Sequence, residues 1–113
     1  MKKVEIKSVK PYKAPGHFDM TALKLHGKEE SGATMFWLGL SHFLPGGGAE
    51  FGGAPVERIY FVLQGEVVVK GEQQEHVLKA QDSLFIGPNE KRELLNKTNQ
   101  PASVLVFCSN PIP

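Results

Sequence analysis

Three side chains in the middle of this 113-residue chain could act as an acid or a base: His42, Glu57 and Tyr60. His42 lies in an apolar segment just before a run of glycines, where a neutral imidazole could accept a proton or hydrogen-bond a ligand. The same residue could equally be an interior histidine whose hydrogen bonds are satisfied. Trp37 and Tyr60 could form an aromatic wall for a small molecule, or could pack in the core.

The sequence lacks the motifs of several large enzyme classes. It contains no G-x-S-x-G elbow, phosphate-binding loop or dinucleotide fingerprint, and the glycines at residues 46–48 are typical of a turn. His17, His26 and His76 border turns or polar connectors, so we expect them to face solvent. The single cysteine, Cys108, cannot form an internal disulfide, and its apolar neighbours favour a packed thiol over a reactive one.

Composition places the chain among ordinary globular proteins of one domain. Hydrophobic residues make up 41% of it and charged residues 22%, and a chain of this length buries a single core. The net charge of +1 gives no field that would favour nucleic acid or an anionic membrane. The N-terminus is basic but lacks the apolar segment of an export signal, so we expect a cytoplasmic protein.

Short apolar or alternating segments recur along the chain without helical periodicity, which predicts an all-β barrel or sandwich. Two of them, residues 59–63 and 67–69, flank Gln64-Gly65 and predict a hairpin. Residues 18–25 and 34–43 are expected to pair antiparallel across the loop at 27–32. The other predicted strands are residues 4–9, as a strand or extended arm, and residues 76–79, 82–86, 92–96 and 103–108.

Two stretches resemble the motifs of the cupin superfamily of small β-barrel proteins. Pro45-Gly46-Gly47-Gly48 and Tyr60-Phe61-Val62-Leu63-Gln64-Gly65 coincide with the first motif, and Asp82 and Asn96 match the second. The resemblance spans residues 34–108 and implies one antiparallel jelly-roll barrel, with residues 1–30 as an N-terminal arm or strands. It also implies a homodimer in which such arms often add a strand to the partner's sheet.

The resemblance also locates the residues where the family binds a divalent metal through three histidines and a glutamate. In this chain those positions are Gly52, Ala54, Arg58 and Arg92. Glycine and alanine have no side-chain donor atom, and a guanidinium stays protonated. We therefore expect no metal and no other cofactor.

Since the family's ligand side chains point into the barrel, Arg58 and Arg92 are expected to reach the same cavity. Two buried guanidiniums need an acceptor, either a protein carboxylate from Glu57, Glu90 or Glu93 or the acidic group of a bound molecule. Both arginines could instead lie on a solvated rim of the barrel.

Three functions remain open from the sequence. The favoured one is a metal-free barrel that binds a small anionic organic molecule, held by Arg58 and Arg92 and shaped by Tyr60, Trp37 and His42. The alternative is a cofactor-independent isomerase, epimerase or lyase, with His42, Tyr60 or Glu57 moving the proton. A non-catalytic structural or regulatory subunit is the third, and a barrel wholly filled by side chains would favour it.

Overall fold

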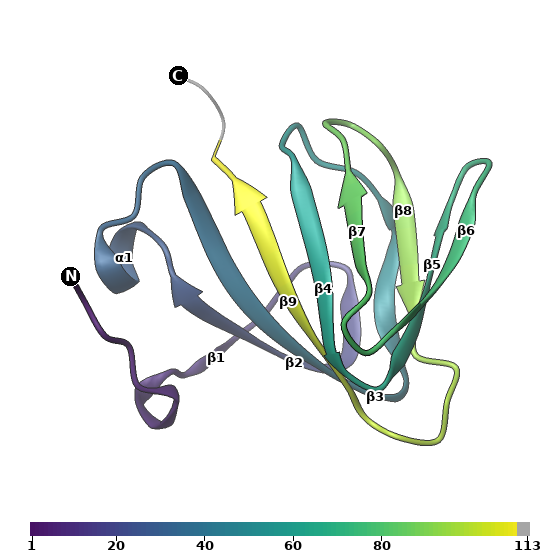
Figure 1. Ribbon diagram of the computed structural model, residues 1–113, viewed down its shortest axis with the longest axis horizontal. Helices are drawn as coiled ribbons and strands as arrows, with labels where there is room; N and C mark the ends of the chain where they lie inside the picture. The colour runs from purple at the N-terminus through teal and green to yellow at the C-terminus, as the bar shows by residue number, and fades with distance from the viewer. Residues whose placement is uncertain (111–113) are drawn as a thin grey trace.

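The computed structural model describes residues 1–110, and antiparallel strands make up most of it (Figure 1). Two short helical segments lie near the N-terminus, η1 (Ile6–Ser8) and α1 (Lys28–Ser31). The strands are β1 (Pro11–Tyr12), β2 (His17–His26), β3 (Phe36–Gly52), β4 (Arg58–Gln64), β5 (Glu66–Gly71), β6 (Glu75–Lys79), β7 (Ser83–Ile86), β8 (Arg92–Leu95) and β9 (Ala102–Ser109).

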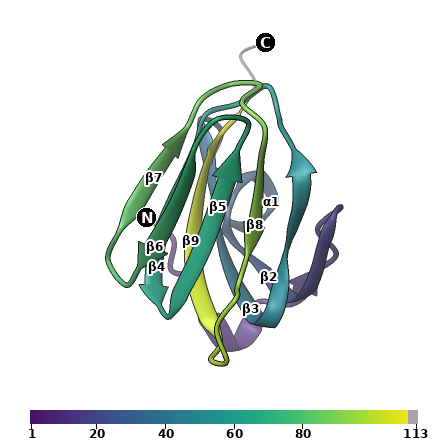
Figure 2. The same ribbon diagram turned by 90° about the vertical axis from the view of Figure 1, so that its right-hand side faces the viewer.

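The strands form a nearly closed antiparallel barrel, which confirms the cupin jelly roll. Hydrogen bonds connect them in the order β6-β5-β8-β3-β9-β4-β7, and β2 joins the sheet beside β3. Figure 2 shows β5, β8 and β3 side by side along one wall. The N-terminal segment lies at the other end of the molecule from β5 and β6 (Figure 1). Within residues 1–110, no helix is long and apolar enough to cross a membrane.

Strand β3 joins the two walls of the barrel and is longer than the sequence predicted. Its first half pairs with β9, and its end from Gly48 to Gly52 pairs with β8. The expected turn at residues 46–48 is a bend inside this strand. A Cβ at Gly48 would lie 2.0 Å from the main-chain oxygen of Leu94, so only glycine lets the two backbones approach this closely.

Residues 59–63 and 67–69 do lie in two strands, but the prediction that these strands pair as a hairpin is wrong. Strand β4 pairs with β7 and β9, whereas β5 pairs with β6 and β8. Gly65 has a φ of +83°, and a Cβ there would lie 2.6 Å from the main-chain oxygen of Pro101. This residue therefore turns the chain from one wall to the other rather than back along the same wall.

Residues 4–9, expected as a strand or an extended arm, form no strand. That segment contains η1, and the first pairing is that of Pro11 and Tyr12 with Leu23 and Ala22 of β2. The predicted antiparallel pairing of residues 18–25 with 34–43 is confirmed in the ladder between β2 and β3. A proline is tolerated at residue 11 because β1 is an edge strand, and proline has no N–H to donate to a further strand.

The core fills the end of the barrel near Gly65 and the bend of β3. Its members are buried apolar side chains from facing strands: Phe43, Ala49, Tyr60, Val62, Val67, Val69, Leu78, Ile86, Leu94, Ala102 and Val104. Alternation along β4 directs Arg58, Tyr60 and Val62 inward together. The inward row of β4 thus changes from apolar to charged toward its first residue, where the interior is not filled.

Candidate functional site

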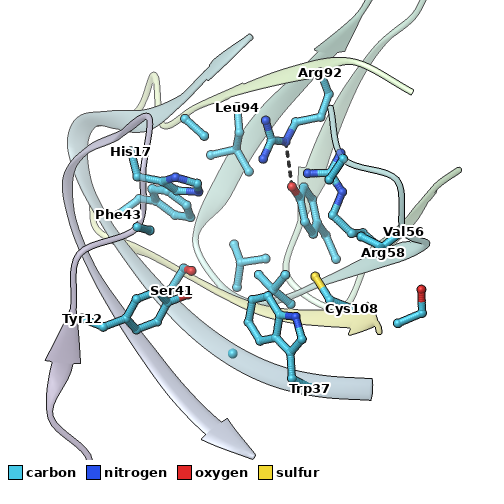
Figure 3. A pocket seen from close by; sticks show the side chains of 18 of the residues that line it. Tyr12, His17, Trp37, Ser41, Phe43, Val56, Arg58, Arg92, Leu94 and Cys108 are labelled. Carbon is cyan, nitrogen blue, oxygen red and sulfur yellow. Dashed lines mark hydrogen bonds between the residues drawn. The ribbon is translucent and has the colours of Figure 1, made fainter. Parts of the chain in front are cut away.

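A cavity of about 310 Å³ lies inside the barrel, lined by inward side chains of β3, β4, β8 and β9 and by the start of β2 (Figure 3). Arg58, Arg92, Tyr60 and Trp37 line it, so the structure brings four of the predicted site residues together. Two of these, Arg58 and Arg92, come from different walls and meet only because the barrel closes. The interior is therefore not wholly filled by side chains.

The two arginines are deeply buried, with exposed fractions of 7% for Arg58 and 8% for Arg92. Within residues 1–110, the ion pairs shorter than 4.0 Å are those of Glu5 with Lys3 and Lys7. The expected counter-ions Glu57, Glu90 and Glu93 are all exposed and pair with neither guanidinium. The rim alternative is also wrong, because a solvated arginine would not be nine-tenths buried.

Neutral groups meet only part of the hydrogen-bonding capacity of the guanidiniums. Arg92 donates from Nε to the hydroxyl of Tyr60 at 2.7 Å and from Nη1 to the main-chain oxygens of Glu50 and Gly52 at 3.2 and 3.4 Å. Arg58 donates from Nη2 to the main-chain oxygen of Glu90 at 3.4 Å. Its Nε is buried without a partner among the described residues. Positive charge at this end of the cavity therefore lacks compensation.

Tyr60 and Trp37 occupy the positions that the sequence assigned to them. Tyr60 is 4% exposed, and because its oxygen accepts the hydrogen bond from Arg92, its own proton is left to donate into the cavity. Trp37 also lines the cavity, and the ammonium nitrogen of Lys24 lies 5.5 Å from the centroid of its ring. Both aromatic rings border space that a ligand could fill.

His42 and Glu57 lie outside the cavity, contrary to expectation. Ser41 and Phe43 line it, so alternation along β3 turns His42 to the other face of the strand. There its Nδ1 lies 2.7 Å from the hydroxyl of Ser103, so a hydrogen bond within the protein satisfies this nitrogen. Glu57 is exposed, and its main-chain nitrogen donates to the hydroxyl of Ser109 at 2.9 Å. Neither residue can act on a molecule in the cavity.

His17 lines the cavity, although the sequence suggested a solvent-facing side chain. Its Nδ1 lies 2.9 Å from the main-chain oxygen of Pro15, which can only accept, so Nδ1 carries a proton. In the neutral ring Nε2 therefore holds the lone pair. Figure 3 shows the ring of His17 across the cavity from Arg58 and Arg92. The pairing of His17 with Ala49 of β3 places it there, and no local motif signals that pairing.

Tyr12 and Cys108 also line the cavity. Burial raises the pKa of the Cys108 thiol above its ordinary value, and the positive charges of Arg58 and Arg92 oppose the rise. Burial likewise raises the pKa of Tyr12, with a smaller contribution from Cys108. The thiol is therefore protonated at neutral pH, which fits the expected packed role better than that of a nucleophile.

The residues at the family's metal positions do not fit a divalent cation. Ala54 lines the cavity as an apolar wall, and Arg58 and Arg92 bring positive charge to the place where anionic or neutral donors would be needed. Gly52 offers no side-chain donor. Residues 1–110 contain no group of three or more His, Cys, Asp or Glu side chains that could hold a metal ion.

Comparison with known proteins gives the same family as the motifs. Residues 39–108 match the family model described as Cupin domain. The chain is 38% identical over 101 residues to Beta-D-galactosidase Rv1717 of Mycobacterium tuberculosis, covering 89% of this chain and 87% of that protein.

Solved structures share the fold at lower sequence identity. Polyketide cyclase RemF from Streptomyces resistomycificus matches with a TM-score of 0.86 and 23% identity, over 100% of this chain and 82% of that one. A sugar phosphate isomerase of the cupin superfamily from Silicibacter pomeroyi matches with a TM-score of 0.81 and 20% identity, over 97% and 76%. Proteins named as enzymes with unrelated reactions thus share this barrel, so the fold alone does not select a reaction.

Proposed function

The chain belongs to the cupin family, and we propose that its barrel binds a small anionic organic molecule between Arg58 and Arg92 without a metal ion. One observation carries the proposal: two guanidiniums are nine-tenths buried in one cavity, and neither has a carboxylate within ion-pairing distance among residues 1–110. An uncompensated buried charge costs several kcal/mol. A bound carboxylate would remove that cost.

The contacts of the site suit a carboxylate better than a neutral group. The free N–H groups of Arg58 and the remaining donors of Arg92 can bind its two oxygens, and planar guanidiniums match carboxylate geometry. The proton of Tyr60 supplies a third donor beside Arg92. Trp37 and the apolar walls then exclude water, which strengthens each of these charge-assisted hydrogen bonds.

Calorimetric titration of the wild type and of the double variant Arg58→Met, Arg92→Met tests the proposal. Naphthoate and galacturonate serve as probes, since both carry a carboxylate on bodies of different polarity. We expect at least one probe to bind the wild type and neither to bind the double variant. Lys91→Met, which removes an exposed charge next to Arg92, is the matched control and should bind as the wild type does. Equal binding by the double variant would refute the proposal.

The relative named as a β-D-galactosidase makes glycoside hydrolysis a second candidate. Most glycosidases use two carboxyl groups, one on each side of the scissile bond. None of the described residues that line the cavity is an aspartate or a glutamate. We therefore expect no hydrolysis of o-nitrophenyl β-D-galactoside above the rate in buffer. Hydrolysis that survives purification and is lost in Tyr60→Phe would favour this candidate instead.

For a cofactor-independent isomerase, epimerase or lyase, one of the predicted acid–base residues lies in the cavity, together with one that was not predicted. Tyr60 faces the cavity, and His17 takes the place expected for His42. A proton could pass between His17 and a bound molecule whose developing negative charge lies near the arginines. A purely structural role has less support, because the barrel holds a cavity of about 310 Å³.

We further propose that the chain forms a homodimer through the outer face of β4, β7 and β9. Ile59 lies beside Phe85 and Phe107 in the ladder, and these side chains are 44%, 56% and 37% exposed. No outward residue of the three strands is Asp, Glu, Lys or Arg. An uncharged apolar face is complementary to a second copy of itself, as a twofold interface requires.

A further inference from the structure

We infer that the acid bound at Arg58 and Arg92 has a flat, largely apolar body, such as an aromatic ring system, with one hydroxyl group at its far end. This inference rests on the proposed function, because it assumes that the arginines hold the acidic group. It specifies the chemical class of the bound acid, an aromatic acid rather than a sugar acid. The choice follows from where polar groups lie along the cavity.

The walls between the two ends of the cavity are mostly apolar. Their large apolar side chains are Trp37, Phe43, Val56, Leu94, Val104 and Val106, and Ser41 adds one hydroxyl group. A sugar carries hydroxyl groups around its whole ring, and each buried hydroxyl without a partner weakens binding about fivefold or more. Two or three such groups against these walls would offset the gain from pairing the carboxylate. A flat apolar body leaves no polar group unpaired there.

Polar side chains on one border of the cavity already have partners in the protein. The hydroxyl of Ser109 accepts from the main-chain nitrogen of Glu57 at 2.9 Å, and Nδ2 of Asn110 donates to the main-chain oxygen of Thr34 at 2.7 Å. Each of these two side chains therefore has only part of its hydrogen-bonding capacity left for a ligand. The hydroxyls of Ser41 and Tyr12 also line the cavity, but apolar side chains outnumber such single polar groups along its walls.

His17 marks that far end and determines its chemistry. Because Nδ1 donates to the main-chain oxygen of Pro15, the Nε2 lone pair of the neutral ring is left to accept a hydrogen bond. Figure 3 shows His17 on the opposite side of the cavity from Arg58 and Arg92. A molecule that spans the cavity thus meets cations at one end and an acceptor at the other. A carboxylate and a hydroxyl group match these two ends.

Titration of the full-length protein with naphthoate, hydroxynaphthoate, galacturonate and galactose tests the choice of class. We expect naphthoate to bind at least about tenfold more tightly than galacturonate, a difference of about 1.4 kcal/mol. Galacturonate that binds as tightly as naphthoate, or more tightly, would overturn this inference and leave the proposed anion site standing. If neither acid bound the wild type, the proposed function itself would fail. Galactose binding as well as galacturonate would also contradict the anion site.

A second comparison isolates the far end. One net hydrogen bond strengthens binding about twofold to twelvefold, so hydroxynaphthoate should bind more tightly than naphthoate by a factor in that range. His17→Asn keeps a donor for the oxygen of Pro15 but lacks Nε2, so the fold should persist and the advantage of the hydroxyl group should vanish. His26→Asn, a residue outside the cavity, is the control and should keep it. An unchanged advantage in His17→Asn would refute the role of Nε2.

Discussion

At the scale of single residues, two arginines are retained inside the barrel at a cost to the folded state. Arg58 and Arg92 are buried with main-chain and tyrosine partners but without a carboxylate among residues 1–110. Apolar residues of similar volume often stabilise a protein when they replace buried ionic groups. Selection for stability alone would not keep both arginines, which is why we propose a bound acid as their counter-ion.

The double variant Arg58→Met, Arg92→Met should therefore be more stable than the wild type in the absence of ligand. We expect its free energy of unfolding in urea to rise by about 1 to 4 kcal/mol, because two desolvated charges disappear. Lys91→Met should change it by less than about 0.5 kcal/mol, as is usual for an exposed side chain. A double variant less stable than the wild type would show that the guanidiniums contribute more through hydrogen bonds than they cost.

Alkylation of Cys108 reports on the same cavity through its pKa. The thiolate is the reactive form, and burial raises the pKa of Cys108 above its ordinary value of 9.0. Iodoacetamide should therefore react slowly with the folded protein at neutral pH. The pH at which the reaction rate rises should be higher for the folded protein than for the protein unfolded in urea. Since the arginines lower this pKa, the double Met variant should react more slowly still.

The stability consequence of Cys108 has a definite sign. The folded thiol keeps its proton at a pH where the unfolded thiol loses it, so this group destabilises the fold as pH rises above 9.0 toward the folded pKa. A bound acid should also shield the thiol from the reagent. Alkylation at the unfolded rate near pH 7, with or without naphthoate, would contradict both the burial and the position of Cys108.

The sequence predicted the arginine end of the site but missed the histidine end. Arg58, Tyr60 and Arg92 could be found because motif spacing fixes which residues face the interior. His17 could not, since it reaches the cavity through the distant pairing of β2 with β3. His42 was misplaced because nothing local shows which of two alternating faces of a strand points inward.

At the scale of elements, glycines decide whether the walls of the barrel can meet. Gly48→Ala should lower the free energy of unfolding by about 2 to 3 kcal/mol, because its Cβ would meet the main-chain oxygen of Leu94 and push β3 away from β8. At Gly52 nothing lies within 4 Å of a Cβ, so Gly52→Ala is the matched control. Urea denaturation of both variants makes the comparison, and equal stability would show that β3 and β8 can separate without cost.

Strands were easier to predict than their partners. Alternation and turn residues located β4, β5, β7 and β9 to within one or two residues. The pairing of β4 with β5 was wrong because the glycine at residue 65 looks the same in a hairpin and in a crossing between walls. Pairing is decided by which faces must be buried together, which is a property of the whole barrel.

At the scale of the whole molecule, the proposed homodimer depends on the uncharged outer face of β4, β7 and β9. Phe107→Glu should raise the dimer dissociation constant about a hundredfold, because a carboxylate would be buried without a partner. Val77→Glu, on exposed β6, should leave it unchanged. Sedimentation equilibrium measures both variants. A monomeric wild type at micromolar concentration, or equal effects of the two substitutions, would contradict this interface.

The anion site itself is tested most directly by crystal structures of the protein grown with naphthoate and with galacturonate. We expect a carboxylate within hydrogen-bonding distance of nitrogen atoms of both Arg58 and Arg92, with the body of the molecule extending toward His17. Density for a divalent metal ion between the arginines, or carboxylates bound only outside the barrel, would contradict it.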